Sequence, residues 1–125
     1  PRFFHERYGL PLWITENGIP TPDPIFLDGK VPDPQRIDYL HRNFLELRRA
    51  MRAGAHVEGY LAWSLLDNFE WQDGYKQRFG LVYVDYQSQR RVPKDSFHWY
   101  KQVIASRGAS LAGEFAVGIS EVTAE

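Results

Sequence analysis

Two short apolar runs dominate the hydrophobic pattern of the chain. They are LPLWIT at residues 10–15 and VEGYLAWSLL at residues 57–66. In each run apolar side chains occupy both of the faces that an extended segment presents, and turn residues flank the runs. Strands covered on both faces are typical of parallel sheets. The pattern therefore predicts two strands of a parallel sheet.

The segment between these runs has the period of an amphipathic helix over residues 33–54. We expect Asp33 to cap its amino end with its side chain, Pro34 to take the first helical position, and Gly54 to end it. Five apolar residues at helical spacing predict the buried stripe of this helix. They are Ile37, Leu40, Phe44, Leu47 and Met51.

The remaining segments are shorter or less regular. Residues 1–8 are typical of the end of a helix, with Gly9 as its stop, and a chain without an initiator Met is expected to begin inside a larger structure. Residues 79–86 and 90–92 predict a β-hairpin, and residues 93–108 a final helix. The tail from Ala109 is weakly patterned and is expected to be frayed.

The order of these elements is strand, helix, strand, hairpin, helix, which indicates βα units in the α/β class. Two parallel strands alone would leave open edges and uncovered apolar faces. A complete (β/α)₈ barrel needs about 250 residues, whereas this chain has 125. The pattern therefore predicts the C-terminal portion of a (β/α)₈ TIM barrel, about the last two βα units plus a β-hairpin. Residues 1–108 would belong to that barrel and residues 109–125 would form a flexible tail.

Composition narrows the classes of partner. The formal net charge is −1, from 15 basic and 16 acidic residues, so neither a nucleic acid nor an anionic membrane surface is an expected partner. There is no apolar run of about 20 residues and no signal peptide, and we expect a cytoplasmic protein. Cysteine is absent, which excludes disulfides and thiolate chemistry.

Carboxylates and indoles gather where the predicted strands end. Glu16 ends the first strand, Trp63 lies late in the second, and Glu70 and Trp71 follow in its loop. Active sites of such barrels lie at the carboxyl ends of the strands. Indole faces stack on the apolar C–H groups of sugar rings, and a carboxylate can accept sugar hydroxyls or attack an anomeric carbon. These residues therefore point to carbohydrate chemistry.

Three longer motifs make the chain recognisable. ITENG (residues 14–18), GYLAWSLLDNFEWQDGYKQRFGLVYVDY (residues 59–86) and RRVPKDSFHWY (residues 90–100) resemble the retaining β-glycosidases of glycoside hydrolase family 1, such as bacterial β-glucosidases. The resemblance covers residues 1–108. It implies hydrolysis of terminal β-linked glycosides with retention, through a glycosyl–enzyme intermediate.

The resemblance also assigns roles by position. It implies that Glu16 is the catalytic nucleophile and that Glu70 binds the distal hydroxyls of the sugar. Trp63 would stack on or flank the sugar, Trp71 would donate its indole N–H to a hydroxyl, and Phe79 would close the pocket. Composition alone would instead pair Glu16 with Glu70 as nucleophile and acid.

The second catalytic carboxyl group has no counterpart in the chain. In the family the acid/base Glu lies in an Asn-Glu-Pro motif on an earlier strand, whereas Asn17, Asn43 and Asn68 are followed here by Gly, Phe and Phe. A retaining mechanism needs both groups. The expected partner is therefore the N-terminal segment of the same barrel. No metal or organic cofactor is implied, and the four His residues lack metal-ligand spacing.

Two other interpretations stay open, a non-catalytic sugar-binding barrel and a structural fragment without activity of its own. Asp67 and Asn68 are expected to be turn and capping groups. The sequence does not distinguish glucose from galactose or fucose as the preferred sugar, nor does it give the aglycone or the oligomeric state.

Overall fold

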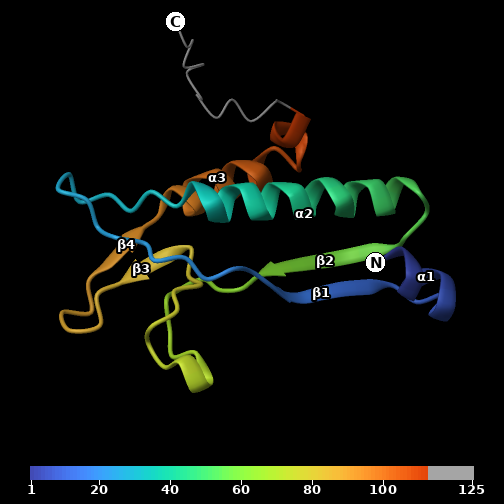
Figure 1. The fold of residues 1–125 in the computed structure, drawn as a ribbon. Helices are drawn as coiled ribbons and strands as arrows, with labels where there is room; N and C mark the ends of the chain where they lie inside the picture. The colour runs from blue at the N-terminus through green and yellow to red at the C-terminus, as the bar shows by residue number, and fades with distance from the viewer. Residues whose placement is uncertain (113–125) are drawn as a thin grey trace, which may run out of the picture.

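The computed structural model describes residues 1–112 and contains short helices, two pairs of strands and two longer helices (Figure 1). The elements in chain order are α1 (Arg2–Tyr8), β1 (Leu12–Asn17), α2 (Pro34–Arg52), β2 (Val57–Ala62), the 3₁₀ helix η1 (Trp71–Asp73), β3 (Val82–Val84), β4 (Arg91–Pro93), α3 (Asp95–Ala105) and the 3₁₀ helix η2 (Ala109–Ala112).

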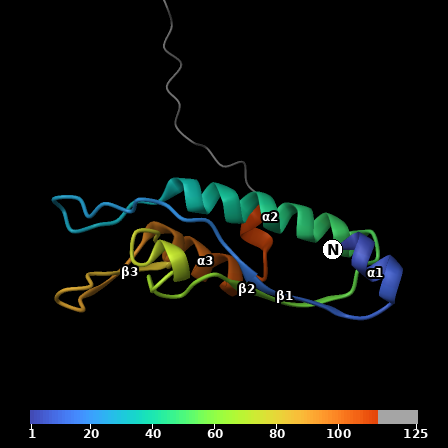
Figure 2. The same ribbon diagram turned by 60° about the horizontal axis from the view of Figure 1, so that its bottom comes forward.

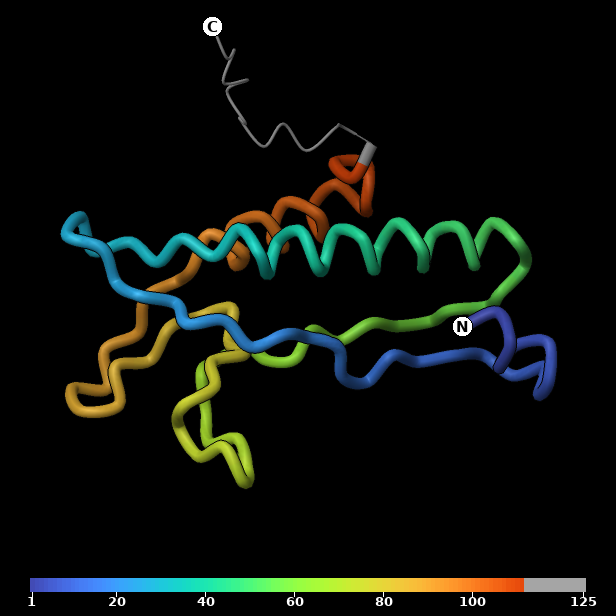
Figure 3. Tube along the Cα trace, viewed as in Figure 1, coloured from blue at the N-terminus to red at the C-terminus, as the bar shows by residue number. Residues whose placement is uncertain are grey.

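Strands β1 and β2 pair in parallel, as predicted, with Ile14 opposite Tyr60. A parallel pair needs a crossover, which α2 supplies by running alongside both strands (Figure 2). Parallel strands end at one edge, so the loops that follow β1 and β2 leave the same end of the pair (Figure 3). The predicted hairpin is also confirmed, because β3 and β4 pair antiparallel beyond that end.

Helix α2 begins as predicted with Pro34 at its first position, but its cap differs. Asp33 takes the N-cap position without a side-chain capping hydrogen bond. Its carboxylate accepts instead from Arg36 and from the backbone and hydroxyl of Ser96. The prediction that Asp33 caps the helix through its side chain is therefore wrong, because the carboxylate is committed to charged and polar partners from α2 and α3.

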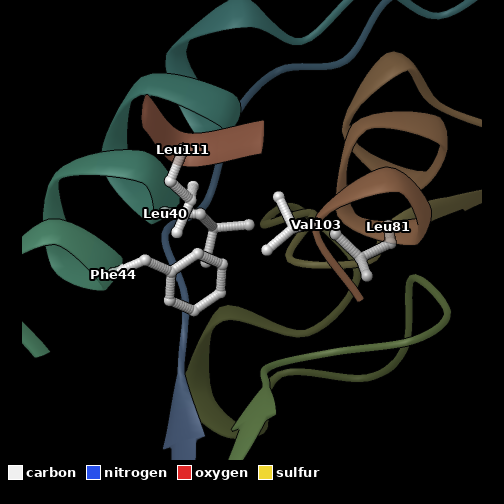
Figure 4. Packing of buried hydrophobic residues seen from close by; sticks show 5 residues of the cluster. All are labelled: Leu40, Phe44, Leu81, Val103 and Leu111. Carbon is white, nitrogen blue, oxygen red and sulfur yellow. The ribbon is translucent and has the colours of Figure 1, made fainter. Parts of the chain in front are cut away.

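The apolar core lies between α2 and α3, over one face of β2 (Figure 4). Its buried members are Leu40, Phe44, Leu81, Val103 and Leu111. The ring of Phe44 meets Tyr60 of β2 edge-on, with centroids 4.7 Å apart, and stacks on Trp99 of α3 at 5.9 Å. The predicted stripe is thus buried at Ile37, Leu40 and Phe44, but Met51 is 48% exposed, because α3 covers only the first part of α2.

The tail predicted from Ala109 begins with four residues that the structure describes. Residues 109–112 form η2, and Leu111 is 7% exposed within the core. Leu111 belongs to the same buried cluster as Val103 of α3, so this turn packs on the core. The rest of the predicted tail, residues 113–125, lies outside the described residues.

The other face of the strand pair stays open. Trp13 is 58% exposed and Leu61 is 52% exposed, and Leu65 beyond β2 is 62% exposed. Strands apolar on both faces were predicted to be covered on both, and within residues 1–112 only the α2 and α3 side is covered. No helix of this part of the chain has the length and apolar character needed to cross a membrane.

Candidate functional site

A shift in strand register lies where Glu16 stands. Ile14 is opposite Tyr60 and Asn17 is opposite Ala62, so both Thr15 and Glu16 face Leu61. Such an extra residue re-aims the side chains around it, and bulges of this kind are frequent beside active sites. The side chain of Glu16 is exposed, whereas the side chain of Asn17 forms hydrogen bonds with residues of α2 and β2.

Asn17 fastens the end of β1 to its surroundings. Its Nδ2 donates to the Tyr39 hydroxyl of α2 at 3.1 Å, and its Oδ1 accepts from the Tyr60 hydroxyl at 2.5 Å. Burial, with smaller effects of Tyr100 and Tyr39, raises the pKa of Tyr60 well above its ordinary value, so the hydroxyl stays a donor. The sequence prediction missed Asn17; a polar residue that ends an apolar strand was the available signal.

Glu16 and Trp63 meet across a hollow of about 240 Å³, which Asn17 and Gly18 also line. The backbone N–H of Trp63 donates to the carbonyl of Asn17 at 2.9 Å. A Cβ on Gly18 would lie 1.9 Å from the Trp63 carbonyl oxygen, so only glycine permits this approach. Trp63 was predicted to lie late in the strand, but β2 ends at Ala62 and Trp63 follows it, joined to Ser64 by a cis peptide bond.

Glu70 lies at the start of η1 and reaches back to Trp63. Its carboxylate accepts from the Trp63 indole at 3.4 Å, and its backbone N–H donates to the carbonyl of Gly74 at 2.7 Å. Both side chains are half-buried. Glu16, Trp63 and Glu70 therefore form one continuous set of neighbours, as expected if they serve one site.

Trp71 and Phe79 are not brought into the hollow. Trp71 is 82% exposed, in a loop that extends away from α2 and α3 (Figure 1). Phe79 is half-buried, and its carbonyl accepts the backbone N–H of Ser64 at 3.1 Å. This bond holds Phe79 next to Ser64, the residue that follows Trp63, although Phe79 does not line the hollow.

A buried network of charges behind the site was missed by the sequence prediction. Lys94, which is fully buried, donates to Asp23 at 2.6 Å and to Asp67 at 2.8 Å. Arg36, 1% exposed, donates to Asp23 at 2.7 Å and also bonds Asp33. Asp67 further accepts from Arg78 at 2.6 Å. Three carboxylates thus meet three cations, so no net charge is buried.

Burial shifts the pKa values within this network. It raises the pKa of Asp33 although Ser96 and Arg36 oppose the shift, and it lowers the pKa of Lys94, with a further contribution from Arg36. The position of Arg36, four residues before Leu40 on the apolar stripe, was a signal that it could be buried. Nothing in the sequence pattern marks Lys94. By bonding Asp23 in the loop after β1 and Asp67 in the loop after β2, Lys94 connects both loops to the start of α3.

Asp67 and Asn68 fit their predicted roles in part. Asp67 accepts from the backbone N–H of Gly80 at 2.9 Å, and Asn68 donates to the Ser64 hydroxyl at 3.1 Å, both of which shape the loop. The ion pairs of Asp67 were not foreseen. Among residues 1–112, no three His, Asp or Glu side chains are grouped as a metal site would require.

Comparison with known proteins gives the family. The sequence profile of Glycosyl hydrolase family 1 matches residues 2–109. The chain is 54% identical over 105 residues to a bifunctional beta-D-glucosidase/beta-D-fucosidase of Bifidobacterium breve, a match that covers 81% of this chain and 23% of that protein. It is 48% identical over 104 residues to beta-glucosidase A of Thermotoga maritima, covering 82% of this chain and 23% of the relative.

Solved structures agree with the sequence comparison. The family 1 β-glucosidase of T. maritima in complex with isofagomine lactam superposes with a TM-score of 0.84 at 45% identity, over 86% of this chain and 25% of that one. The same enzyme has been solved with deoxynojirimycin. The chain is thus a mixed α/β segment that aligns with part of a family 1 glycosidase and spans about a quarter of its relatives' length. It belongs to glycosyl hydrolase family 1.

Proposed function

We propose that this chain forms the C-terminal portion of a (β/α)₈ barrel that hydrolyses terminal β-linked glycosides with retention of configuration. The observation that carries the proposal is the hollow at the carboxyl end of β1, where exposed Glu16 faces Trp63 and Glu70 accepts from the Trp63 indole. A carboxylate beside an aromatic face fits attack on a sugar whose ring rests on that face.

Glu16 is the proposed nucleophile. One of its carboxylate oxygens attacks the anomeric carbon, the bond to the leaving oxygen breaks, and that oxygen takes a proton from an acid group. Water then attacks the same carbon, gives up its proton to that group as base, and releases Glu16. Two inversions leave the configuration retained.

The acid/base group is proposed to come from the segment that supplies the earlier strands. Such carboxyl pairs lie about 5–5.5 Å apart in retaining enzymes. The open side of β1 and β2, where Trp13 and Leu61 are more than half exposed, is where those strands would pack. We assign residues 1–108 to this barrel and residues 109–125 to its C-terminal tail.

Substrate contacts are proposed for the other site residues as well. Glu70, Trp63, Trp71 and Phe79 would bind the terminal sugar. Trp71 and Phe79 contribute only if the completed barrel folds their loop inward, since neither lines the hollow within residues 1–112. The name of the B. breve relative includes both a glucosidase and a fucosidase activity, so we propose a pocket for β-glucosides or related glycosides.

The test uses what we call the complemented barrel: the 125-residue chain co-expressed with the part of T. maritima β-glucosidase A that it does not match. We expect cleavage of an aryl β-glucoside, with the β-anomer as the first product by NMR. The α-anomer as first product would overturn retention. A folded complex that binds sugar without turnover would favour the non-catalytic barrel, and failure to form a complex would contradict the proposed place of the chain.

A further inference from the structure

We propose that Asp67 is the positioning residue of the sugar-binding loop, which we define as residues 63–80. The proposal rests on the proposed function, because it concerns the loop that carries Trp63 and Glu70. Asp67 touches neither the hollow nor Glu70. It would act by fixing where the loop begins and ends.

Four hydrogen bonds converge on the Asp67 carboxylate. Its Oδ1 accepts from Lys94 at 2.8 Å and from the backbone of Gly80 at 2.9 Å. Its Oδ2 accepts from Arg78 at 2.6 Å and from the backbone of Val84 at 3.3 Å. Asp67 stands near the start of the loop, whereas Arg78 and Gly80 stand at its end. One carboxylate therefore closes the loop across its base.

Close packing at the same place supports this closure. A Cβ on Gly80 would lie 2.2 Å from the backbone nitrogen of Asp67 and 2.7 Å from its Oδ1. The Asp67 backbone N–H also donates to the carbonyl of Val82 at 3.0 Å. The two ends of the loop are thus in direct contact, with no side chain between them.

Beyond its base the loop is held by bonds within itself and by Tyr86, whose ring centroid lies 4.5 Å from that of Tyr75, while several of its aromatic side chains are exposed. Phe69 is 57% exposed, Trp71 is 82% exposed and Tyr75 is 57% exposed. Trp63 is also fixed by Asn17 and Gly18, so the closed base acts mainly on the position of Glu70 relative to the Trp63 indole. If the carboxylate loses its charge, its bonds to Lys94 and Arg78 weaken, and Glu70 can shift by a distance that matters for binding.

Asp23 provides a matched control within the same network. It is 2% exposed and Asp67 is 4% exposed, and both aspartates bond Lys94 and one arginine. Asp23, however, belongs to the loop after β1, and within residues 1–112 no hydrogen bond joins it directly to residues 63–80. It reaches that loop only through Lys94, Arg36 and Thr21, and the last two bond the backbone carbonyl of Arg78 and not the Asp67 carboxylate. Losing either charge should lower stability, but only Asp67 should alter sugar binding.

The experiment measures the dissociation constant of deoxynojirimycin by calorimetry, together with the melting temperature, in the complemented barrel. We expect Asp67→Asn to weaken binding at least tenfold and Asp23→Asn to change it by less than about twofold, while both lower the melting temperature. Arg78→Gln is the milder variant if Asp67→Asn does not assemble. Arg78 is partly accessible and Lys94 still pairs with Asp67, so the complex should survive with binding about three- to fivefold weaker.

Equal effects of Asp67→Asn and Asp23→Asn on deoxynojirimycin binding would overturn the proposal. Unchanged binding in Asp67→Asn would also overturn it. If Asp67→Asn does not assemble, unchanged binding in Arg78→Gln would do the same. Failure of the proposed function would give a different result from failure of this proposal, because the complemented barrel without any substitution would then not bind deoxynojirimycin at all.

Discussion

The contact between Gly18 and Trp63 gives the sharpest structural prediction. A Cβ at position 18 would lie 1.9 Å from the Trp63 carbonyl oxygen, whereas close C···O contacts in proteins are about 3.3 Å. In Gly18→Ala the two backbones must therefore separate by more than about 1 Å. Misplacement of reacting groups by about 1 Å costs about a hundredfold in rate, which corresponds to about 2.7 kcal/mol of transition-state stabilisation.

The assay is kcat/KM for an aryl β-glucoside in the complemented barrel, with Gly54→Ala as control. Gly54 has φ 97° and open space around its Cβ position, at the amino end of β2. Alanine there should cost about 1–2 kcal/mol of stability through its left-handed backbone and leave turnover unchanged. If Gly18→Ala retained full activity, the proposed meeting of the Glu16 strand with Trp63 would be refuted.

Three further predictions follow from the site and the packing. Glu70→Gln keeps an acceptor for the Trp63 indole but removes the charge, so kcat/KM should fall by a factor equivalent to about 1.5–3 kcal/mol of transition-state stabilisation. The acidic limb of the pH profile should persist, and loss of that limb would make Glu70 the attacking group. The 125-residue chain purified alone should show no turnover and no cooperative melting transition, because Trp13, Leu61 and Leu65 stay exposed; a sharp transition with turnover would contradict the need for a companion segment. Because burial raises the pKa of Asp33 above its ordinary value of 3.8, the folded state keeps a proton that the unfolded state releases, and stability should fall as pH rises between the two pKa values. Asp33→Asn should remove that slope in melting temperatures measured at increasing pH from the ordinary pKa of 3.8 upward. An unaltered slope would show that Asp33 does not titrate as described.

The pattern of the sequence predicted the elements well because local signals were strong. Pro34 and the spacing of Leu40 and Phe44 predicted α2, and the two apolar runs predicted strands that do pair in parallel. The boundaries were less accurate. Residues 63–66 continue the apolar pattern of β2, yet after Trp63 the backbone leaves β1. Ser64 instead bonds the backbone of Phe79 and Leu81, long-range contacts that no local pattern encodes.

The sequence predicted only those residues of the candidate site that local signals mark. Position at the end of an apolar strand marked Glu16, and the neighbouring aromatics marked Glu70, because both signals are local. The ion pairs of Lys94 with Asp23 and Asp67 join residues 71 and 27 positions apart. A buried lysine is rare unless it is paired, and its partners could be identified only once the fold had brought the loops together.

The identity of the nucleophile is the central claim, and Glu16→Ala tests it most directly. In the complemented barrel this variant should lose several orders of magnitude in turnover, because no covalent intermediate can form. Azide should then partly restore cleavage of an activated β-glucoside and give the α-glycosyl azide, whose inverted configuration is read by NMR. Near-normal turnover without azide, or a β-configured azide product, would contradict the assignment of Glu16.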